Sequence, residues 1–158
     1  MVSLVMVPAL VYMILSCGHE KKDRVESLLS EMTLEEKIGQ MMQICFSTIT
    51  TQGTKELDLD LEKARKAILE MHTGSFISAT GRAEDWIDFV QRVQKIAVED
   101  TRLGIPLLIG IDHVHGANYV DQATFLPHPI TLGCRFDPEI ASLAARITAL
   151  EMADLGLN

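Results

Sequence analysis

The sequence has fewer basic than acidic residues, and this shortage argues against a nucleic-acid partner. Its 14 Lys and Arg residues stand against 22 Asp and Glu residues, which gives a net charge of −8 at neutral pH. Nucleic-acid phosphates are bound by clustered positive charge, so we expect no nucleic-acid partner. The acidic balance selects no substrate, because an acidic surface mainly affects solubility.

Cysteine is also scarce, with 3 residues in 158, and the cysteine spacing fits no zinc or redox motif. We therefore expect no metal and no cofactor. Cys45 and Cys134 could form a disulfide in an oxidising compartment, but we favour two small buried apolar side chains.

No apolar run reaches the roughly 20 residues that a membrane-spanning helix needs. Residues 1–15 are uncharged and precede Ser16 and Cys17, a pattern typical of a secretory signal peptide. Because residues 14–17 resemble a bacterial lipobox, we favour a lipoprotein-type signal peptide over residues 1–17, lipidated at Cys17, and a tether over residues 18–23. A conventionally cleaved signal and an uncleaved anchor remain open. The prediction is export to the periplasm or cell envelope, with membrane contact only through this N-terminal lipid anchor.

The rest of the chain has the composition of one globular domain. Hydrophobic residues make up 47% and charged residues 23%, which is typical of a protein with a packed core. Apolar residues at helical spacing predict helices over residues 23–31, 34–42, 57–71, 83–100 and 138–156. Thr33 and Glu36 form a capping box before the second helix, and Asp137 is the N-cap of the last.

Three of these helices carry predictions about the core. We expect Met41 and Met42 to fill core space. The helix over 83–100 has one apolar stripe of Trp86, Phe89, Val90, Val93 and Ala97. Trp86 could stack on a sugar, but a tryptophan on such a stripe favours a core position. The last helix is expected to bury a face made of Ile140, Leu143, Ala144, Ile147 and Leu150.

Two strands frame the helix over 83–100. Residues 74–78 predict a short strand, and the uninterrupted apolar run 107–111 predicts a parallel strand buried on both faces. Strand, helix and strand make a βαβ unit with a right-handed connection. Ligands bind at the carboxyl ends of such strands. Asp112, which ends the run, therefore stands where an α/β enzyme places a substrate-binding carboxylate.

Four segments resemble the N-terminal domain of glycoside hydrolase family 3 and follow in the family's order. Residues 110–118 (GIDHVHGAN) resemble its G-[IV]-D-x-V-H-G signature, and residues 123–128 (ATFLPH) its A-T-x-F-P-H segment. Residues 32–41 (MTLEEKIGQM) match its opening, and residues 148–156 (TALEMADLG) its T-A-L-E-x-R-A-x-G helix. Four ordered matches disfavour an unrelated periplasmic binding domain that shares only an α/β start.

This resemblance implies an α/β fold, the first part of a (β/α)8 TIM-type barrel. Such a barrel has eight strands, and we find two or three, so residues 24–158 are expected to form an incomplete barrel domain. The implied activity is hydrolysis of O-glycosidic bonds in β-glucosides or related β-glycosides by a retaining mechanism. The implied partner is an oligo- or aryl-glycoside substrate, in carbohydrate metabolism.

The resemblance also assigns roles to residues. Asp112 matches the family's sugar-binding aspartate, whose two oxygens accept hydrogen bonds from hydroxyls near C4 and C6; a loop-fixing aspartate is the alternative. Retention needs two carboxyl groups about 5–5.5 Å apart. The Ser-Asp-Trp segment of the nucleophile and the Lys-His sugar-binding segment do not occur in the sequence. We therefore expect the nucleophile and the acid/base beyond Asn158, no catalytic residue in this chain, and an inactive N-terminal fragment.

Three histidines near Asp112 would permit a metal site, since imidazoles are common ligands. These are His113, His115 and His128, but the family's residues at 115 and 128 hold the loop after the strand, and we favour that role. The alternative function is a non-catalytic truncated lipoprotein remnant or a weak carbohydrate-binding module.

Overall fold

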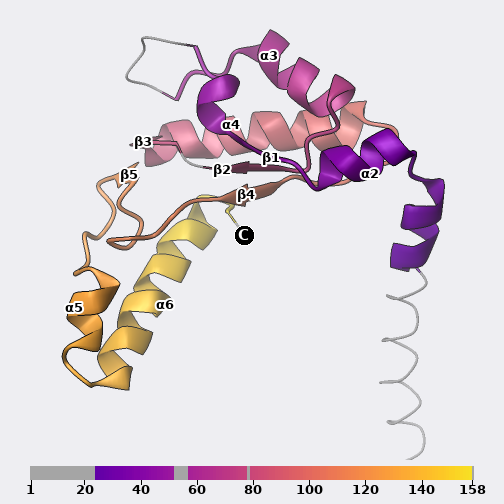
Figure 1. The fold of residues 1–158 in the computed structure, drawn as a ribbon. Helices are drawn as coiled ribbons and strands as arrows, with labels where there is room; N and C mark the ends of the chain where they lie inside the picture. The colour runs from indigo at the N-terminus through magenta and orange to yellow at the C-terminus, as the bar shows by residue number, and fades with distance from the viewer. Residues whose placement is uncertain (1–23, 52–56, 78, 158) are drawn as a thin grey trace, which may run out of the picture.

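The structure is a computed structural model that describes residues 24–51, 57–77 and 79–157. Figure 1 shows a mixed α/β fold around a small sheet. The signal peptide and tether predicted over residues 1–23, with Cys17, lie outside the described residues. Within the described part, no helix combines the length and the apolar character needed to cross a membrane.

Three parallel strands form the sheet in the order β1-β2-β4, and a second parallel pair lies beside it. The strands are β1 (Gln43–Cys45), β2 (Ser75–Ile77), β4 (Leu108–Gly110) and, in the pair, β3 (Gly81–Arg82) and β5 (Val120–Asp121). The strand predicted over 74–78 is confirmed as β2. We did not predict β1, which begins three residues after Gln40, the last residue of the second helix.

The helices agree with the predicted pattern, with one addition. They are residues 24–31, α2 (Leu34–Gln40), α3 (Leu61–Arg65), α4 (Ala83–Lys95), α5 (Pro129–Gly133) and α6 (Pro138–Asp154). π-Helical turns over Lys66–Glu70 and Ile96–Asp100 extend α3 and α4, and a 3-10 turn covers Phe46–Thr48. The helix predicted from Leu57 begins later, because the Asp60 carboxylate caps it by accepting from the Lys63 N–H at 3.1 Å.

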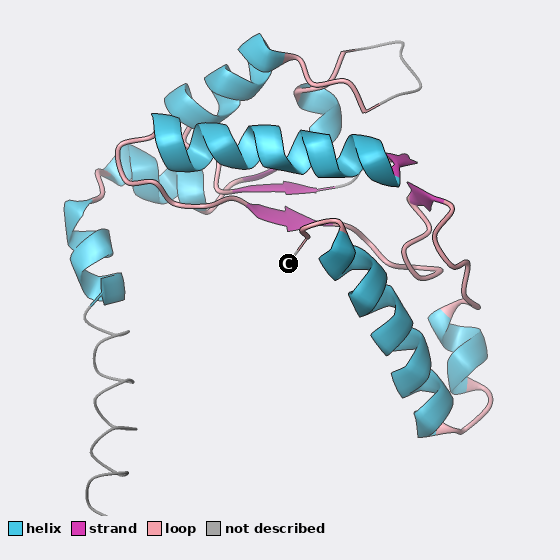
Figure 2. Cartoon of the chain, turned by 180° about the vertical axis from the view of Figure 1, so that it is seen from behind, coloured by secondary structure: helices cyan, strands magenta, loops and turns pink. Residues whose placement is uncertain are grey.

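One face of the sheet is covered by α3 and α4, as Figures 1 and 2 show. Phe76 and Ile109 share this face by register and are almost completely buried. The predicted stripe of α4 also packs here, and its Trp86 is fully buried. Trp86 is therefore a core residue and offers no surface for stacking on a sugar.

The opposite face of β4 is open, so the prediction of a strand buried on both faces is wrong. Leu107 and Ile109 are each 2% exposed, whereas Leu108 between them is 65% exposed. Successive side chains of a strand point to opposite faces. Because α3 and α4 both pack on the face of Ile109, Leu108 lies on the uncovered side.

The predicted core role of Met41 is wrong as well. Met41 is the C-cap of α2 and is 80% exposed. The buried residue of α2 is Gly39, where an added Cβ would lie 2.5 Å from the Cβ of His72. The helix thus packs through a close backbone contact, which leaves its larger side chains outside.

Two further predictions about burial need correction. On α6, Ala144 is buried but Leu143 and Leu150 are more than half exposed, so the predicted face is only partly packed. Cys45 is partly buried and Cys134 is exposed, and no disulfide joins them. The interpretation of two buried cysteines therefore fails for Cys134, which follows α5 at the surface.

Hydrogen bonds from Arg102 join three segments at the amino end of the sheet. The capping box is present: the Thr33 N–H donates to Glu36 Oε2 at 2.8 Å, and the Glu36 N–H donates to Thr33 Oγ1 at 3.2 Å. Arg102 Nη2 donates to the same Glu36 oxygen at 2.7 Å and to the Glu31 carbonyl at 2.8 Å. These bonds hold the pKa of Glu36 below its ordinary value, first through Arg102 and then through Thr33.

This contact predicts a pH-dependent stability. A carboxyl whose pKa is lowered in the folded state stabilises it above the unfolded value of about 4.3, and this contribution is lost as the pH falls through the lowered pKa. We expect Arg102→Gln to lower the urea midpoint at pH 7, and to lower it less at pH 2. The Arg102 bond to the Glu31 carbonyl does not titrate, so a residual difference remains in acid. Arg92→Gln, which removes an exposed pair with Asp88 at 3.4 Å, is the control. An equal loss at both pH values for Arg102→Gln would contradict the prediction.

Candidate functional site

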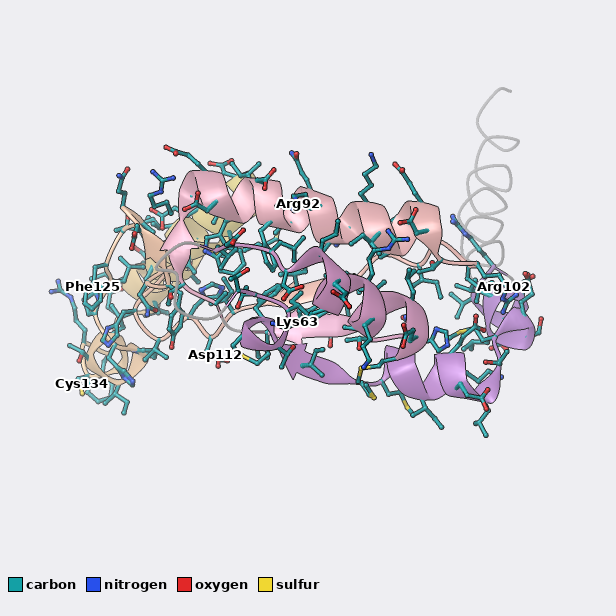
Figure 3. The ribbon with its side chains drawn as sticks, turned by 90° about the horizontal axis from the view of Figure 1, so that it is seen from above. Lys63, Arg92, Arg102, Asp112, Phe125 and Cys134 are labelled. Carbon is teal, nitrogen blue, oxygen red and sulfur yellow. The ribbon has the colours of Figure 1, made fainter. Side chains whose placement is uncertain are left out.

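Asp112 lies just past the carboxyl end of β4, where the sequence placed it. Its side chain is exposed, and Figure 3 shows it labelled at this end of the molecule. Cys45, Ile77 and Gly110 are the register partners that end the three parallel strands. A carboxylate at this edge is open to solvent and able to accept hydrogen bonds from a polyhydroxylated ligand.

His115 fixes the loop that follows Asp112. The Leu126 N–H donates to the His115 carbonyl at 2.9 Å, and His115 Nδ1 lies 3.0 Å from the Leu126 carbonyl. Because a carbonyl only accepts, Nδ1 is assigned the proton in this pair. The His115 N–H also donates to Asn118 Oδ1 at 3.1 Å. His115 thus joins the segment after β4 to the segment before α5.

His128 has a different but equally local contact. Its Nδ1 accepts from the Ile130 N–H at 3.2 Å, which makes His128 the N-cap of α5. The rings of His115 and His128 meet edge to face with centroids 5.5 Å apart, and the ring of Phe125 stacks on His115 at 4.7 Å. Both histidines therefore make the loop-holding contacts that we favoured for them.

The described residues around Asp112 do not form a metal-binding group. His113 is exposed beside Asp112. Across the described residues, no group of three or more His, Cys, Asp or Glu side chains could hold a metal ion. At this edge the carboxylate of Asp112 can accept hydrogen bonds.

Two hydrogen bonds near the candidate site were missed by sequence reasoning. The N–H and the hydroxyl of Thr124 both donate to Glu151 Oε1, at 3.0 and 2.6 Å. Glu151 belongs to α6, so this contact anchors the loop before α5 to the following helix. Thr124 and Glu151 stand in two of the four family-like segments, 123–128 and 148–156, but the sequence does not show that they contact each other.

A largely apolar cavity of about 730 Å³ lies between β4 and the helices α5 and α6. Ile111 and His113, the neighbours of Asp112, line this cavity, while Asp112 itself does not. A second cavity of about 340 Å³ lies at the amino end of the strands and is lined by Glu36, His72 and Arg102 among others. The larger cavity is the one adjacent to the candidate site.

Comparison with curated proteins identifies similar chains. Residues 33–158 match the family described as Glycosyl hydrolase family 3 N terminal domain. The Lysosomal beta glucosidase of Dictyostelium discoideum is 33% identical over 144 residues, which cover 84% of this chain and 17% of that protein. The Periplasmic beta-glucosidase of Salmonella typhimurium is 31% identical over 134 residues, which cover 85% of this chain and 15% of that protein.

Solved structures agree with the sequence matches. A glycoside hydrolase family 3 beta-N-acetylglucosaminidase from Paenibacillus superposes with a TM-score of 0.61 at 29% identity, over 80% of this chain and 23% of that one. A mutant beta-glucosidase from Listeria innocua in complex with laminaribiose gives a TM-score of 0.57 at 33% identity, over 82% of this chain and 17% of that one. The described α/β fold thus resembles part of known family members.

These matches cover most of this chain but only a small part of each relative. The chain spans less than a fifth of the length of the two curated relatives above. The family match itself covers most of the chain, from residue 33 to residue 158, and includes Asp112 and Glu151. This chain belongs to glycoside hydrolase family 3.

Proposed function

We propose that this chain provides Asp112 to the sugar-binding site of a retaining β-glycosidase. The observation that carries the proposal is an exposed carboxylate at the shared carboxyl end of three parallel strands, within a segment that resembles the family signature. Asp112 accepts charge-assisted hydrogen bonds from two sugar hydroxyls. Two similar proteins are named beta-glucosidases, and another is bound to laminaribiose. The substrate class is therefore β-glucosides or related β-glycosides, as oligo- or aryl-glycosides.

The fold supports a place in a larger barrel. β1 and β4 are edge strands, and Leu108 presents an uncovered apolar face. Further parallel strands of a (β/α)8 barrel would pair with these edges and cover that face. In this arrangement the nucleophile and the acid/base come from parts of the whole protein outside these 158 residues, and no cofactor takes part.

The proposed compartment is the cell envelope. A signal peptide over residues 1–17, lipidation at Cys17 and a tether over residues 18–23 would place the domain outside the cytoplasm. The support is the uncharged N-terminal run and the periplasmic name of one relative.

A second candidate function is a weak carbohydrate-binding module, in which the exposed Asp112 accepts hydrogen bonds from a sugar that the protein does not hydrolyse.

Hydrolysis with retention gives a direct test. We expect the protein, as its gene encodes it, to release the aglycone from an aryl β-glucoside or β-xyloside with a kcat of about 1–1000 s⁻¹. Proton NMR of the fresh reaction is expected to show the β-anomer of the sugar first. The α-anomer appearing first would contradict retention. Binding of glucose without release of the aglycone would favour the carbohydrate-binding alternative.

A further inference from the structure

The loop that carries Asp112 is tied to α6 through one carboxylate, and we propose that Glu151 is the residue that positions Asp112. This inference rests on the proposed sugar-binding role of Asp112 and adds a positioning residue to it. Glu151 does not touch the substrate in this scheme. It binds Thr124, and Leu126, two residues further along the same segment, is hydrogen-bonded to His115.

The first step concerns the freedom of Asp112. On its amino side, Gly110 is held in β4 by its register with Ile77 of β2. On its carboxyl side, His115 is held by the hydrogen bonds to Leu126 and Asn118. Only four residues separate these two anchor points. The orientation of the Asp112 carboxylate therefore depends on where the His115 anchor lies.

The second step concerns the partner of His115. The contact with Leu126 uses both the carbonyl and the ring of His115, at 2.9 and 3.0 Å. The two segments also approach closely at Gly116, which has a φ of 74°. An added Cβ there would lie 2.8 Å from the Thr124 carbonyl. The Asp112 loop is thus positioned against residues 124–126.

The third step concerns what holds residues 124–126. Glu151 Oε1 accepts from both the N–H and the hydroxyl of Thr124, at 3.0 and 2.6 Å. Hydrogen bonds to a carboxylate are about twice as strong as those between neutral groups. Glu151 lies near the end of the 17-residue α6, close to the buried Met152. The anchor therefore lies beside a buried residue of α6.

The two carboxylate oxygens of Glu151 differ in their bonding, and this difference can be tested by substitution. Oε2 is buried and has no hydrogen-bond partner among the described residues. All of the observed bonding passes through Oε1, which a glutamine side chain also provides. Glu151→Gln should therefore keep both bonds to Thr124 but weaken them, because charge assistance is lost, whereas Glu151→Ala removes both. If only the negative charge of Glu151 mattered, Glu151→Gln would be as damaging as Glu151→Ala.

The experiment compares variants of the protein as its gene encodes it. In Thr124→Val, which removes one of the two bonds to Glu151, we expect the amide of Leu126 to exchange about tenfold faster, and in Glu151→Ala, which removes both, faster still. We also expect the order parameter of the Asp112 amide to fall from about 0.85 to below 0.6. The affinity for D-glucose should fall about tenfold. Glu151→Gln, which keeps the acceptor oxygen without its charge, should lie between the wild type and Glu151→Ala in all three. The double variant Glu151→Ala/Thr124→Val should be no worse than Glu151→Ala.

The controls separate this inference from the function on which it rests. Glu139→Ala removes another acidic side chain of α6, an exposed one, and should change none of the three measurements. Unchanged Leu126 exchange or unchanged Asp112 order in Glu151→Ala would overturn the positioning role. If the wild-type protein fails to bind glucose, the proposed function fails, while the exchange and order measurements still decide whether Glu151 orders Asp112.

Discussion

Asp112→Asn is expected to lower kcat/KM for an aryl β-glucoside by about 10²–10³-fold, which corresponds to roughly 3–4 kcal/mol of lost transition-state stabilisation. The neutral amide keeps one acceptor oxygen, but its NH2 group cannot accept a sugar hydroxyl proton and the charge assistance is lost. Because the carboxylate is exposed, its replacement leaves the core packing intact. The measurement is steady-state kinetics beside a thermal melt.

Asp121→Asn is the matched control for this variant. Asp121 is also exposed and lies in β5, in the same connection between β4 and α6. Its replacement should leave kcat/KM within about twofold of the wild type. An unchanged kcat/KM for Asp112→Asn would refute the sugar-binding assignment. A large loss of melting temperature would instead show that Asp112 fixes the loop.

Phe46→Ala is expected to lower the free energy of unfolding by about 3–5 kcal/mol. Phe46 is fully buried and joins the sheet to α4. Its ring centroid lies 5.3 Å from that of Phe76, 4.9 Å from that of Phe89 and 5.7 Å from that of Trp86. Truncation to alanine leaves a cavity among three aromatic rings that cannot all close in. Urea unfolding measures the loss.

Phe136→Ala provides the comparison for this core substitution. Phe136 is 93% exposed, so its truncation removes little buried surface. We expect its effect to stay within about 0.5 kcal/mol. If the two variants lost the same free energy, the aromatic cluster would not be the centre of the core.

The elements with strong periodic or capping signals could be predicted from the sequence. The stripe on α4 specifies one buried face, and Asp137 with Pro138 marks the start of α6. The buried positions that remained hidden depend on long-range contacts. Gly39 is buried because His72 approaches its backbone, and a glycine carries no hydropathy signal for such a contact.

Sequence patterns also could not predict the existence of β1, or which side chains of β4 and α6 are exposed. β1 has three residues, too few for an alternating pattern to stand out. The run 107–111 is apolar on both faces, yet only the side of Ile109 is covered within the described residues. Leu143 and Leu150 keep a helical spacing on α6 while remaining exposed. A pattern reports which face is apolar, whereas burial depends on what packs against it.

At the candidate site, the position of Asp112 could be predicted and its support could not. The end of an apolar run marks the carboxyl end of a strand, so Asp112 was visible from the sequence. The bonds of Thr124 with Glu151 join polar residues 27 positions apart, and no spacing rule connects such a pair. His115 and His128 were expected to hold the loop, but only the structure shows that each does so through Nδ1.

The strand order β1-β2-β4 is also the order in which the ribosome makes these strands. Each register links segments roughly thirty residues apart, so each new strand emerges when its neighbour already exists. At a synthesis rate of about 5–20 residues per second, one strand is added every few seconds. The sheet can therefore grow from β1 during translation, and the outer edge of β1, which is made first, stays open longest to mispairing or to chaperone capture.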